Sequence, residues 1–582
     1  MPDLSQTQPA TFPLEGGLVL DKPQFAMQAG EALELQNFEP DIDGGYRRIN
    51  GFTKYNANIV PQTSSSSEEI LMTTFFNGDI IVARGEKIFR GTNGSNALNG
   101  SINTSVTTIT VDSTTNFSTA GTLLIGSEQI TYTGKSSTQF TGCGRGANST
   151  SAAEHSDDAT VTQYWTEIDS GRSGAGVYTF AHFTNAGGAK RLMVVDGDND
   201  PWLCTDDWDS DPTSIAHEDI TDNSNAVQGS KFVVHFKGHM IYAGRSAAPA
   251  EVYIGEKDDH DDLTNNILVH NLDSPVVGLK VFRETLFVFC ENRIWKITGS
   301  ATSGTDIFVK QPVTQNIGCV NGQTIQEFAG DLIFLAPDGL RTVAGTARIG
   351  DVELGTVSGP VKSFINAHIA SADKFRSLVI PDKTQYRLFF TKSGTSQTST
   401  HGLIAVIKNN KFEFSQIYGI KPTSTDTLVD TSGTTVVHGG ADGYVYQQES
   451  GSSFDGTAIE GKYRSPDLNF GDSGVRKHMQ RVLLNYKPEA SLSADLYLRY
   501  DYESPDTPTP LAYSISDVNV AAVYGEAVYN DVATYGGQKE PLKRISVEGS
   551  GFTVAVRVND NGVGAPYALR GVGLEYQVGA RR

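Results

Sequence analysis

A short phrase recurs seven times along this chain and constrains the fold more than any other feature. Each copy has a turn, a run of alternating apolar residues, a turn that carries Gly, Asp or Asn, and a second short run. The copies span residues 76–91, 190–204, 236–255, 282–299, 328–345, 386–395 and 434–447. A period of about 40 to 50 residues built from strands and turns is typical of a β-propeller, so we expect an all-β chain with about seven blades.

The copies are evenly spaced except at one step. Their first core residues are Ile80, Leu192, Met240, Leu286, Leu332, Leu388 and Val436, and the steps are 112, 48, 46, 46, 56 and 48 residues. The long step contains residues 100–163, a Thr-rich alternating stretch broken by Gly turns. We therefore predict a propeller of residues 66–455 that is interrupted by a small β-module of residues 100–163. The exposed faces of this module are candidate docking surfaces.

The two ends of the chain do not keep the period. Residues 1–65 are punctuated by glycines, and we expect an extended segment that completes the propeller platform. Residues 456–582 contain alternating runs, which predict a C-terminal β-sandwich. Residues 502–541 interrupt that sandwich and are rich in Pro, Tyr and Gly, so we expect a projecting arm. The alternating runs cover residues 482–486, 492–498, 552–558 and 572–578.

Composition supports strands over helices. The chain has 60 Gly, 28 Phe and 22 Tyr, which favour strands and tight turns. Residues 360–378 are the best helical stretch, with Pro360 placed to start it. The chain has no apolar run near the roughly 20 residues that a membrane span needs, and its start does not resemble a secretion signal.

The four cysteines show no metal-type pairing. Cys290 lies inside an apolar run, so we predict a buried free thiol and folding in a reducing cytoplasm. The cysteines are Cys143, Cys204, Cys290 and Cys319.

The chain is strongly acidic. It carries 67 acidic and 46 basic residues, for a net charge of −21. A surface that grips nucleic acid needs clustered Lys and Arg, so the charge argues against that function. It remains compatible with nucleic acid that slides past without sticking, although a solubilising acidic surface is the simpler interpretation.

Candidate chemistry is sparse. Residues 196–207 resemble a calcium loop, but Pro201 stands where the loop needs Gly, so we expect a solvated acidic turn. Residues 256–263 place five acids around His260, which suggests either a metal site or, more simply, solvated surface. Residues 142–146, GCGRG, do not have the strand and helix of a phosphate loop and predict a hairpin turn. We predict no catalytic, metal or cofactor residues and expect a protein that is not an enzyme.

Both ends of the chain resemble one protein family. Residues 16–52, GGLVLDKPQFAMQAGEALELQNFEPDIDGGYRRINGF, look like the opening of the tail nozzle proteins of short-tailed bacteriophages, also called tail tubular protein B or tail stabilisation proteins. Residues 549–582 resemble their terminal strands, including the closing G-x-x-x-E-Y-x-x-G-x-R-R. Residues 121–150 resemble a small β-module that recurs in many phage tail proteins.

The resemblance implies a structural virion protein of a phage tail that is assembled in the host cytoplasm. It implies a homohexameric ring beneath the head-to-tail adaptor ring, with tail fibres or spikes attached outside. DNA and ejected proteins would leave through a gated channel, and the arm of residues 502–541 with the blade loops is the candidate gate. Six copies at −21 carry a formal charge of −126, which would let viral DNA pass without sequence-specific binding.

Two alternatives belong to other classes. A carbohydrate-binding or carbohydrate-cleaving propeller, acting as a receptor-binding tail protein, would place aromatic platforms beside paired carboxylates. The local candidates for that site are Trp202, Trp208, Asp206, Asp207 and Asp209. A cellular scaffold of the WD type is the third possibility, but the repeats do not contain the Gly-His to Trp-Asp signature of that class.

Overall fold

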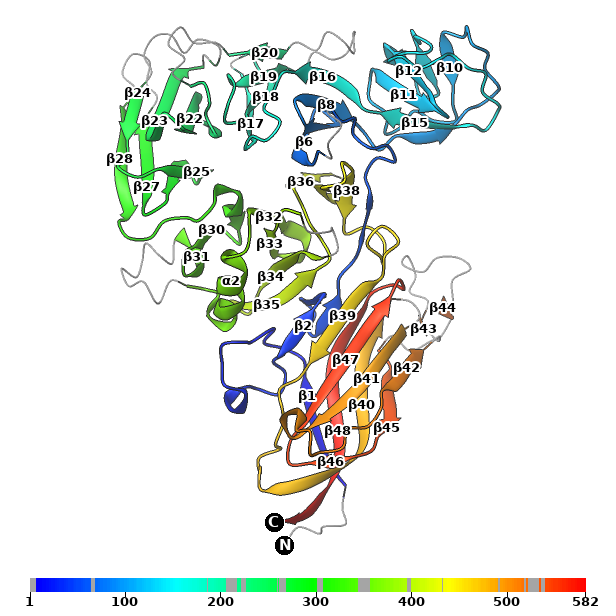
Figure 1. The fold of residues 1–582 in the computed structure, drawn as a ribbon, viewed down its shortest axis with the longest axis vertical. Helices are drawn as coiled ribbons and strands as arrows, with labels where there is room; N and C mark the ends of the chain where they lie inside the picture. The colour runs from blue at the N-terminus through cyan, green and yellow to red at the C-terminus, as the bar shows by residue number, and fades with distance from the viewer. Residues whose placement is uncertain are drawn as a thin grey trace.

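The computed structural model describes residues 7–63, 68–185, 187–205, 217–220, 227–258, 260, 268–300, 307–343, 356–394, 399–431, 433–489, 492–517, 520–521, 533–534 and 540–581. Within these residues the chain consists mainly of antiparallel β-sheets (Figure 1), so the predicted all-β class is confirmed. The predicted helix is present but short, because α2 covers only Lys362–Ile369 and Pro360 lies in the preceding 3₁₀ turn.

Small sheets, most of them four-stranded, follow one another from residue 70 to residue 448, and we call them together the ring (Figure 1). Sheet one contains β6 (Ile70–Phe76), β7 (Asp79–Arg84), β8 (Lys87–Gly91) and β16 (Thr166–Ser170). Sheet two contains β17 (Thr179–Thr184), β18 (Lys190–Val195), β19 (Trp202–Thr205) and β20 (His217–Asp219). Sheet three contains β21 (Phe232–Phe236), β22 (His239–Arg245), β23 (Ala248–Lys257) and β24 (Leu268–Asn271).

The remaining sheets of the ring continue in chain order. Sheet four contains β25 (Val276–Phe282), β26 (Thr285–Cys290), β27 (Ile294–Ser300) and β28 (Ile307–Thr314), and sheet five contains β29 (Gln326–Phe328), β30 (Asp331–Ala336) and β31 (Gly339–Thr342). Sheet six contains β32 (Lys374–Ile380), β33 (Gln385–Thr391), β34 (His401–Lys408) and β35 (Lys411–Tyr418). Sheet seven contains β36 (Ser424–Asp430), β37 (Gly433–Gly439), β38 (Val445–Gln448) and, from the N-terminal segment, β5 (Phe52–Lys54).

Each sheet of the ring corresponds to one copy of the sequence repeat. The first core residue of every copy lies on the second strand of its sheet and is at most 2% exposed. In sheet one the hairpin between β6 and β7 turns at Asn77 and Gly78, whose φ angles are 49° and 87°. Asn-Gly with two positive φ angles is the turn whose twist matches that of the flanking strands, so the local sequence specifies this hairpin.

Hydrophobic clusters hold each sheet to the next. Ile81 of sheet one shares a cluster with Leu192 of sheet two, and equivalent clusters follow between successive sheets. The pairs that represent them are Met193 with Met240, Ile241 with Leu286, Phe289 with Phe334, Leu335 with Leu388, and Phe389 with Val436. Val437 of sheet seven shares a cluster with Ile80 of sheet one, so side-chain packing closes the ring.

A module of residues 95–164 is inserted between β8 and β16. Its two small sheets pack around their own buried core, which includes Leu123, Ile130 and Phe140. One sheet contains β9 (Ser95–Ala97), β11 (Gly121–Ile125), β12 (Glu128–Tyr132) and β15 (Thr160–Tyr164), and the other contains β10 (Thr108–Thr110), β13 (Gly134–Lys135) and β14 (Gln139–Thr141). Figure 1 shows the module at one side of the ring, beside β8 and β16.

The C-terminal region has two facing sheets, and we call it the sandwich. One contains β1 (Gln8–Pro13), β3 (Phe38–Pro40), β4 (Tyr46–Arg48), β40 (Val475–Pro488), β45 (Leu542–Ser546), β46 (Ser550–Gly551) and β48 (Tyr567–Arg581). The other contains β2 (Glu34–Gln36), β39 (Ile459–Arg464), β47 (Val554–Gly562), β41 (Leu492–Tyr500) and β42 (Tyr513–Asp517). The largest hydrophobic cluster of the described chain fills the space between them and continues into sheets five and six of the ring. Its members in the sandwich include Leu484, Leu496, Val556 and Leu574.

One sheet continues from the ring into the sandwich. β2 pairs in parallel with β35 of the ring and antiparallel with β39 of the sandwich, which makes a nine-stranded sheet. Much of the predicted arm of residues 502–541 lies outside the described residues, and β42 with the short strands β43 (Val520–Ala521) and β44 (Ala533–Thr534) belongs to its described part. In the described residues we find no helix long and apolar enough to cross a membrane.

Candidate functional site

A cavity of about 830 Å³ lies where the first strands of six sheets of the ring face one another. The strands that line it are β17, β21, β25, β29, β32 and β36. Lys280 on β25, Glu327 on β29 and Asp426 on β36 bring charged side chains to its wall. The cavity is the best candidate for small-molecule chemistry in the ring, because it combines two carboxylates and an amine in a concave site.

Hydrogen bonds hold Asp426 in place. Its carboxylate accepts from the backbone N–H of Phe75, at 3.1 Å, and of Thr427, at 2.9 Å. Burial nevertheless raises the pKa of Asp426, because desolvation outweighs the hydrogen bonds that favour the charged form. Burial also lowers the pKa of the nearby His182 and that of Lys280. Burial at the cavity wall therefore favours the uncharged form of the Asp426 carboxyl group and of the Lys280 amine.

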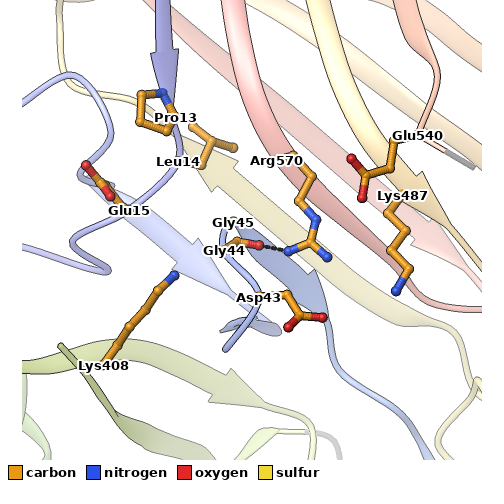
Figure 2. Close-up of a pocket in the computed structure, with 10 residues that line it drawn as sticks. All are labelled: Pro13, Leu14, Glu15, Asp43, Gly44, Gly45, Lys408, Lys487, Glu540 and Arg570. Carbon is orange, nitrogen blue, oxygen red and sulfur yellow. Dashed lines mark hydrogen bonds between the residues drawn. The ribbon is translucent and has the colours of Figure 1, made fainter.

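A second pocket, of about 430 Å³, lies at the joint between the N-terminal segment and the sandwich (Figure 2). Arg570 on β48 crosses it and donates from Nη1 to the carbonyl oxygen of Gly44 and pairs with Asp41 at 3.2 Å. Gly45 is required here, because its φ is +84° and an added Cβ would lie 2.1 Å from the carbonyl oxygen of Leu569. The charged residues that line the pocket are Glu15, Asp43, Lys408, Lys487, Glu540 and Arg570. Three acids and three bases balance, so the pocket favours neither anions nor cations.

The predicted solvated turn at residues 196–207 is wrong for Asp196, which is only 2% exposed. Its carboxylate accepts from the backbone N–H of Ser173 at 3.0 Å, of Asp198 at 3.0 Å and of Asn199 at 2.8 Å. Burial alone would raise the pKa of Asp196, but these hydrogen bonds outweigh burial and lower it. The carboxylate takes the place of solvent at these backbone N–H groups and so stabilises the turn. Its role is structural.

Trp202, a candidate aromatic platform under the carbohydrate alternative, is excluded from that role. Trp202 is 1% exposed and packs in the cluster between sheets one and two. Trp208, Asp206, Asp207 and Asp209 lie outside the described residues.

Two other candidate segments lie at residues 256–263 and 142–146. At residues 256–263, Glu256 and Lys257 lie on β23, His260 packs edge-on against Phe183 with ring centroids 5.3 Å apart, and Asp259 and residues 261–263 lie outside the described range. The GCGRG segment follows β14, and its Gly144 forms an isolated antiparallel bridge with Thr131. Arg145 of this segment forms a two-pronged ion pair with Glu128 at 2.8 Å. Within the described residues, no three His, Cys, Asp or Glu side chains lie close enough together to hold a metal ion.

All four cysteines are buried free thiols. Cys290 is fully buried, as predicted, and burial raises its pKa to about 12, so it is a poor nucleophile.

Sequence reasoning missed a buried charge network between the ring and the N-terminal segment. Glu39 on β3 accepts from Lys383 at 2.7 Å and from Arg47 at 3.1 Å, and Arg387 on β33 reaches both Glu39 and Glu449. The charges of Arg387 and Lys383 outweigh burial and lower the pKa of Glu449. Glu39 is 344 positions from Lys383 and 348 from Arg387, so no spacing could have revealed the network.

Comparisons with known proteins identify no family. No protein-family model matches the sequence, and no curated protein matches it. Among solved structures, an exo-β-1,3-galactanase from Phanerochaete chrysosporium is 10% identical, with coverage of 81% of this chain and 100% of that one and a TM-score of 0.24. A putative 6-phosphogluconolactonase from Bacteroides uniformis is 11% identical over 60% of this chain and 93% of that one, at a TM-score of 0.30. Kluyveromyces lactis Hsv2 is 8% identical over 60% of this chain and 97% of that one, with a TM-score of 0.26. Similarity this low supports no argument about function.

Proposed function

We propose that this chain is a structural subunit of the distal nozzle of a short phage tail. The observation that carries the proposal is the place of the two segments that resemble such proteins. β4, from the N-terminal segment, and β48, from the C-terminal segment, pair in one sheet of the sandwich, and β1 pairs with β48 on the same sheet. Two segments at opposite ends of the chain thus make one structural unit, and a shared function is the simplest reason to keep both.

In this proposal the ring is a seven-bladed β-propeller, the module is an insertion in its first blade, and the sandwich is the platform. The first blade is completed after the insertion by β16, and the last blade is completed by β5 from the N-terminal segment. A strand from the chain's start in the last sheet ties the ring closed. The nine-stranded sheet that crosses from ring to sandwich would transmit force between them.

The partners follow from the proposed place in the virion. Six copies would form the homohexamer, the head-to-tail adaptor ring would bind above it, and fibres or spikes would dock outside. A net charge of −21 per copy suits a channel that DNA passes without being held, since like charges repel. A ring whose subunits repeat one heterologous interface closes without an exposed end. The proposal assigns the chain no catalytic residue and no cofactor.

Electron microscopy of the purified protein, alone and mixed with the adaptor ring, tests the proposal. We expect six-fold rings at least in the mixture, with the chain on the tail axis in a map of the virion. A monomer that stays a monomer in the presence of the adaptor would overturn the proposal, and so would a virion map that places the chain away from the axial exit.

A carbohydrate-cleaving ring is the second candidate, and the central cavity favours it. Asp426 and Glu327 are two carboxylates in one cavity, with Tyr178 and Phe232 also at its wall. Glycoside cleavage needs such a pair, one acid kept protonated and one charged. Release of reducing sugar from bacterial polysaccharide, lost in Asp426→Asn and in Glu327→Gln but kept in the exposed control Glu460→Gln, would establish this function. No release by the wild type would exclude it.

A further inference from the structure

The module and the ring enclose a cleft that neither the nozzle proposal nor the carbohydrate-cleaving candidate uses. It has a volume of about 560 Å³, within the range of roughly 300 to 1,000 Å³ that is usual for ligand pockets. One wall is the module, with Gln129 on β12 and Tyr164 on β15, and the other is sheet one, with Lys87 on β8 and Glu167 on β16. We call it the module cleft.

Tyr164 gives the module cleft a half-buried aromatic wall with a polar end. The side chain of Gln129 lines the same wall, and its Oε1 accepts from the Asn148 amide at 2.8 Å. The loop that presents Asn148 has a left-handed backbone, with φ angles of 50° at Asn148 and 66° at Ser149. Amides that hold one another in position retain free donors and acceptors, because each amide has two N–H groups and a two-lone-pair oxygen.

The opposite wall is charged but nearly neutral. Lys87 and Glu167 form an ion pair at 2.6 Å, and their side chains are 36% and 44% exposed. Asp169, deeper along β16, is paired with Arg172. A cleft without excess positive charge does not suit a polyanion such as nucleic acid, since phosphate binding depends on unpaired Lys and Arg.

The two walls are held at a fixed separation. Trp165, the one residue between β15 and β16, is 2% exposed, and its indole N–H donates to the carbonyl oxygen of Asn58 at 2.8 Å. The Asn56 amide donates to the carbonyl oxygens of Thr92 and Gln163, at 2.6 and 3.0 Å, on the two chain segments that enter and leave the module. The cleft is therefore formed before any ligand arrives, which reduces the entropy cost of binding.

A second buried contact fixes the other side of the joint. Arg90 on β8 pairs with Asp79 at 3.1 Å and donates to the carbonyl oxygen of Ala120 in the module at 2.8 Å. Ser118 of the module donates to the same Asp79 carboxylate at 2.8 Å. These groups are buried, so their loss on moving the module would be costly.

We propose that the module cleft is a binding site for a neutral oligosaccharide. A sugar has an apolar C–H face, which fits the half-buried ring of Tyr164, and a rim of hydroxyls that both donate and accept. Planar amides and carboxylates beside an aromatic ring supply the matching contacts. An apolar peptide would leave these polar groups unpaired. The site does not depend on the nozzle assignment or on the carboxylates of the central cavity.

An array of neutral and acidic bacterial oligosaccharides, followed by calorimetric titration of the strongest binder, tests the proposal on the full chain. We expect a neutral oligosaccharide to bind. Tyr164→Ala should weaken binding about ten-fold and Gln129→Ala about three-fold or more, because each removes one stabilising contact. Tyr502→Ala is the control, since this tyrosine is 51% exposed and lies outside the cleft.

Three results would overturn the proposal. They are the absence of any bound oligosaccharide, a strict preference for acidic ones, and binding that Gln129→Ala leaves unchanged. Limited proteolysis of residues 95–164 shows whether Tyr164→Ala unfolds the module. If it does, binding by Gln129→Ala alone decides the test. Binding that is lost in Asp426→Asn but not in Gln129→Ala would move the site to the central cavity.

Discussion

The ring and the sandwich bury their hydrophobic side chains in different ways. In the ring the core is divided into clusters between neighbouring sheets, and each sheet is made mainly from consecutive residues. In the sandwich one large cluster is shared by strands from both ends of the chain, and it extends into sheets five and six of the ring through Leu335 and Leu388. Gln8 pairs with Tyr576. The ring therefore depends on local contacts that repeat, whereas the sandwich depends on long-range contacts that occur once. Damage should stay local where the ring has separate clusters, and it should spread through the sandwich and the two ring sheets that share its cluster.

The largest effect is expected where the sandwich holds a buried ion pair. Arg48 on β4 and Asp560 on β47 pair at 2.7 Å, with side chains 1% and 4% exposed. Arg48→Ala leaves a buried carboxylate without its partner, so we expect a loss of about 3 to 5 kcal/mol in unfolding free energy. Urea unfolding with hydrogen exchange by region measures it, and exchange should rise throughout the sandwich.

The matched control is the exposed pair of Arg481 and Glu575, at 3.4 Å with side chains 57% and 25% exposed. Arg481→Ala should cost less than about 1 kcal/mol, as exposed ion pairs do. Equal losses in the two variants would contradict the view that burial makes the sandwich joint strong.

Acid should weaken the closure of the ring. His438 on β37 is fully buried beside Phe52 of β5, and burial lowers its pKa to about 3. In the unfolded chain the imidazole of His438 is protonated below a pH of about 6.5, whereas in the folded chain it stays neutral down to a pH of about 3. The folding stability present above pH 6.5 is therefore lost as the pH falls toward 3. Between pH 7 and pH 4 we expect a loss of about 3 kcal/mol.

His438→Phe should flatten that pH dependence, as urea melts from pH 7 to pH 4 would measure. His478→Phe, at an exposed position on β40, is the control and should keep the wild-type slope. If the unfolding free energy of His438→Phe depended on pH as steeply as that of the wild type, His438 would not be the source of the acid sensitivity.

A smaller and more local effect is expected in the module. Glu128 is 1% exposed and accepts from Arg145 and from His155 at 2.7 Å. Burial opposes its ionisation, but these hydrogen bonds outweigh burial and lower its pKa to about 2. Glu128→Gln should cost about 2 kcal/mol, because Arg145 loses its counter-charge. Limited proteolysis should then cut residues 95–164 while the ring and sandwich stay protected, and Glu154→Gln, on the module surface, should change nothing.

The smallest effect is expected at the hairpin between β6 and β7 of the ring, which can be compared with a glycine at the sandwich joint. Gly78→Ala places a side chain at φ +87° where no atom lies within 4 Å, so only backbone strain of about 1 kcal/mol is expected. Gly45→Ala in the sandwich joint adds a clash with Leu569 and should cost more. Thermal melts of both variants measure the difference, and the reverse order would contradict the contrast between local and shared cores.

The prediction from sequence succeeded where contacts are local. The core positions of the repeat, from Ile80 to Val436, follow from alternation and turn chemistry, and each lies buried on its own sheet. It failed for burial and for contacts between distant segments. Asp196 and Trp202 are buried although the sequence placed them in a solvated turn and in a candidate binding platform. The network of Glu39, Arg387 and Glu449 left no pattern in the sequence.

The amino-acid sequence by itself determined the all-β class and the core positions of the repeat, because strand alternation and turn residues act over a few neighbouring positions. The tertiary structure alone decided that β5 would complete the last sheet, that the two chain ends would share the sandwich, and that the module would face sheet one across a cleft. Those arrangements bring together segments that lie tens to hundreds of residues apart. Burial of apolar area is not directional, so a local sequence pattern does not specify which distant surfaces will pack together.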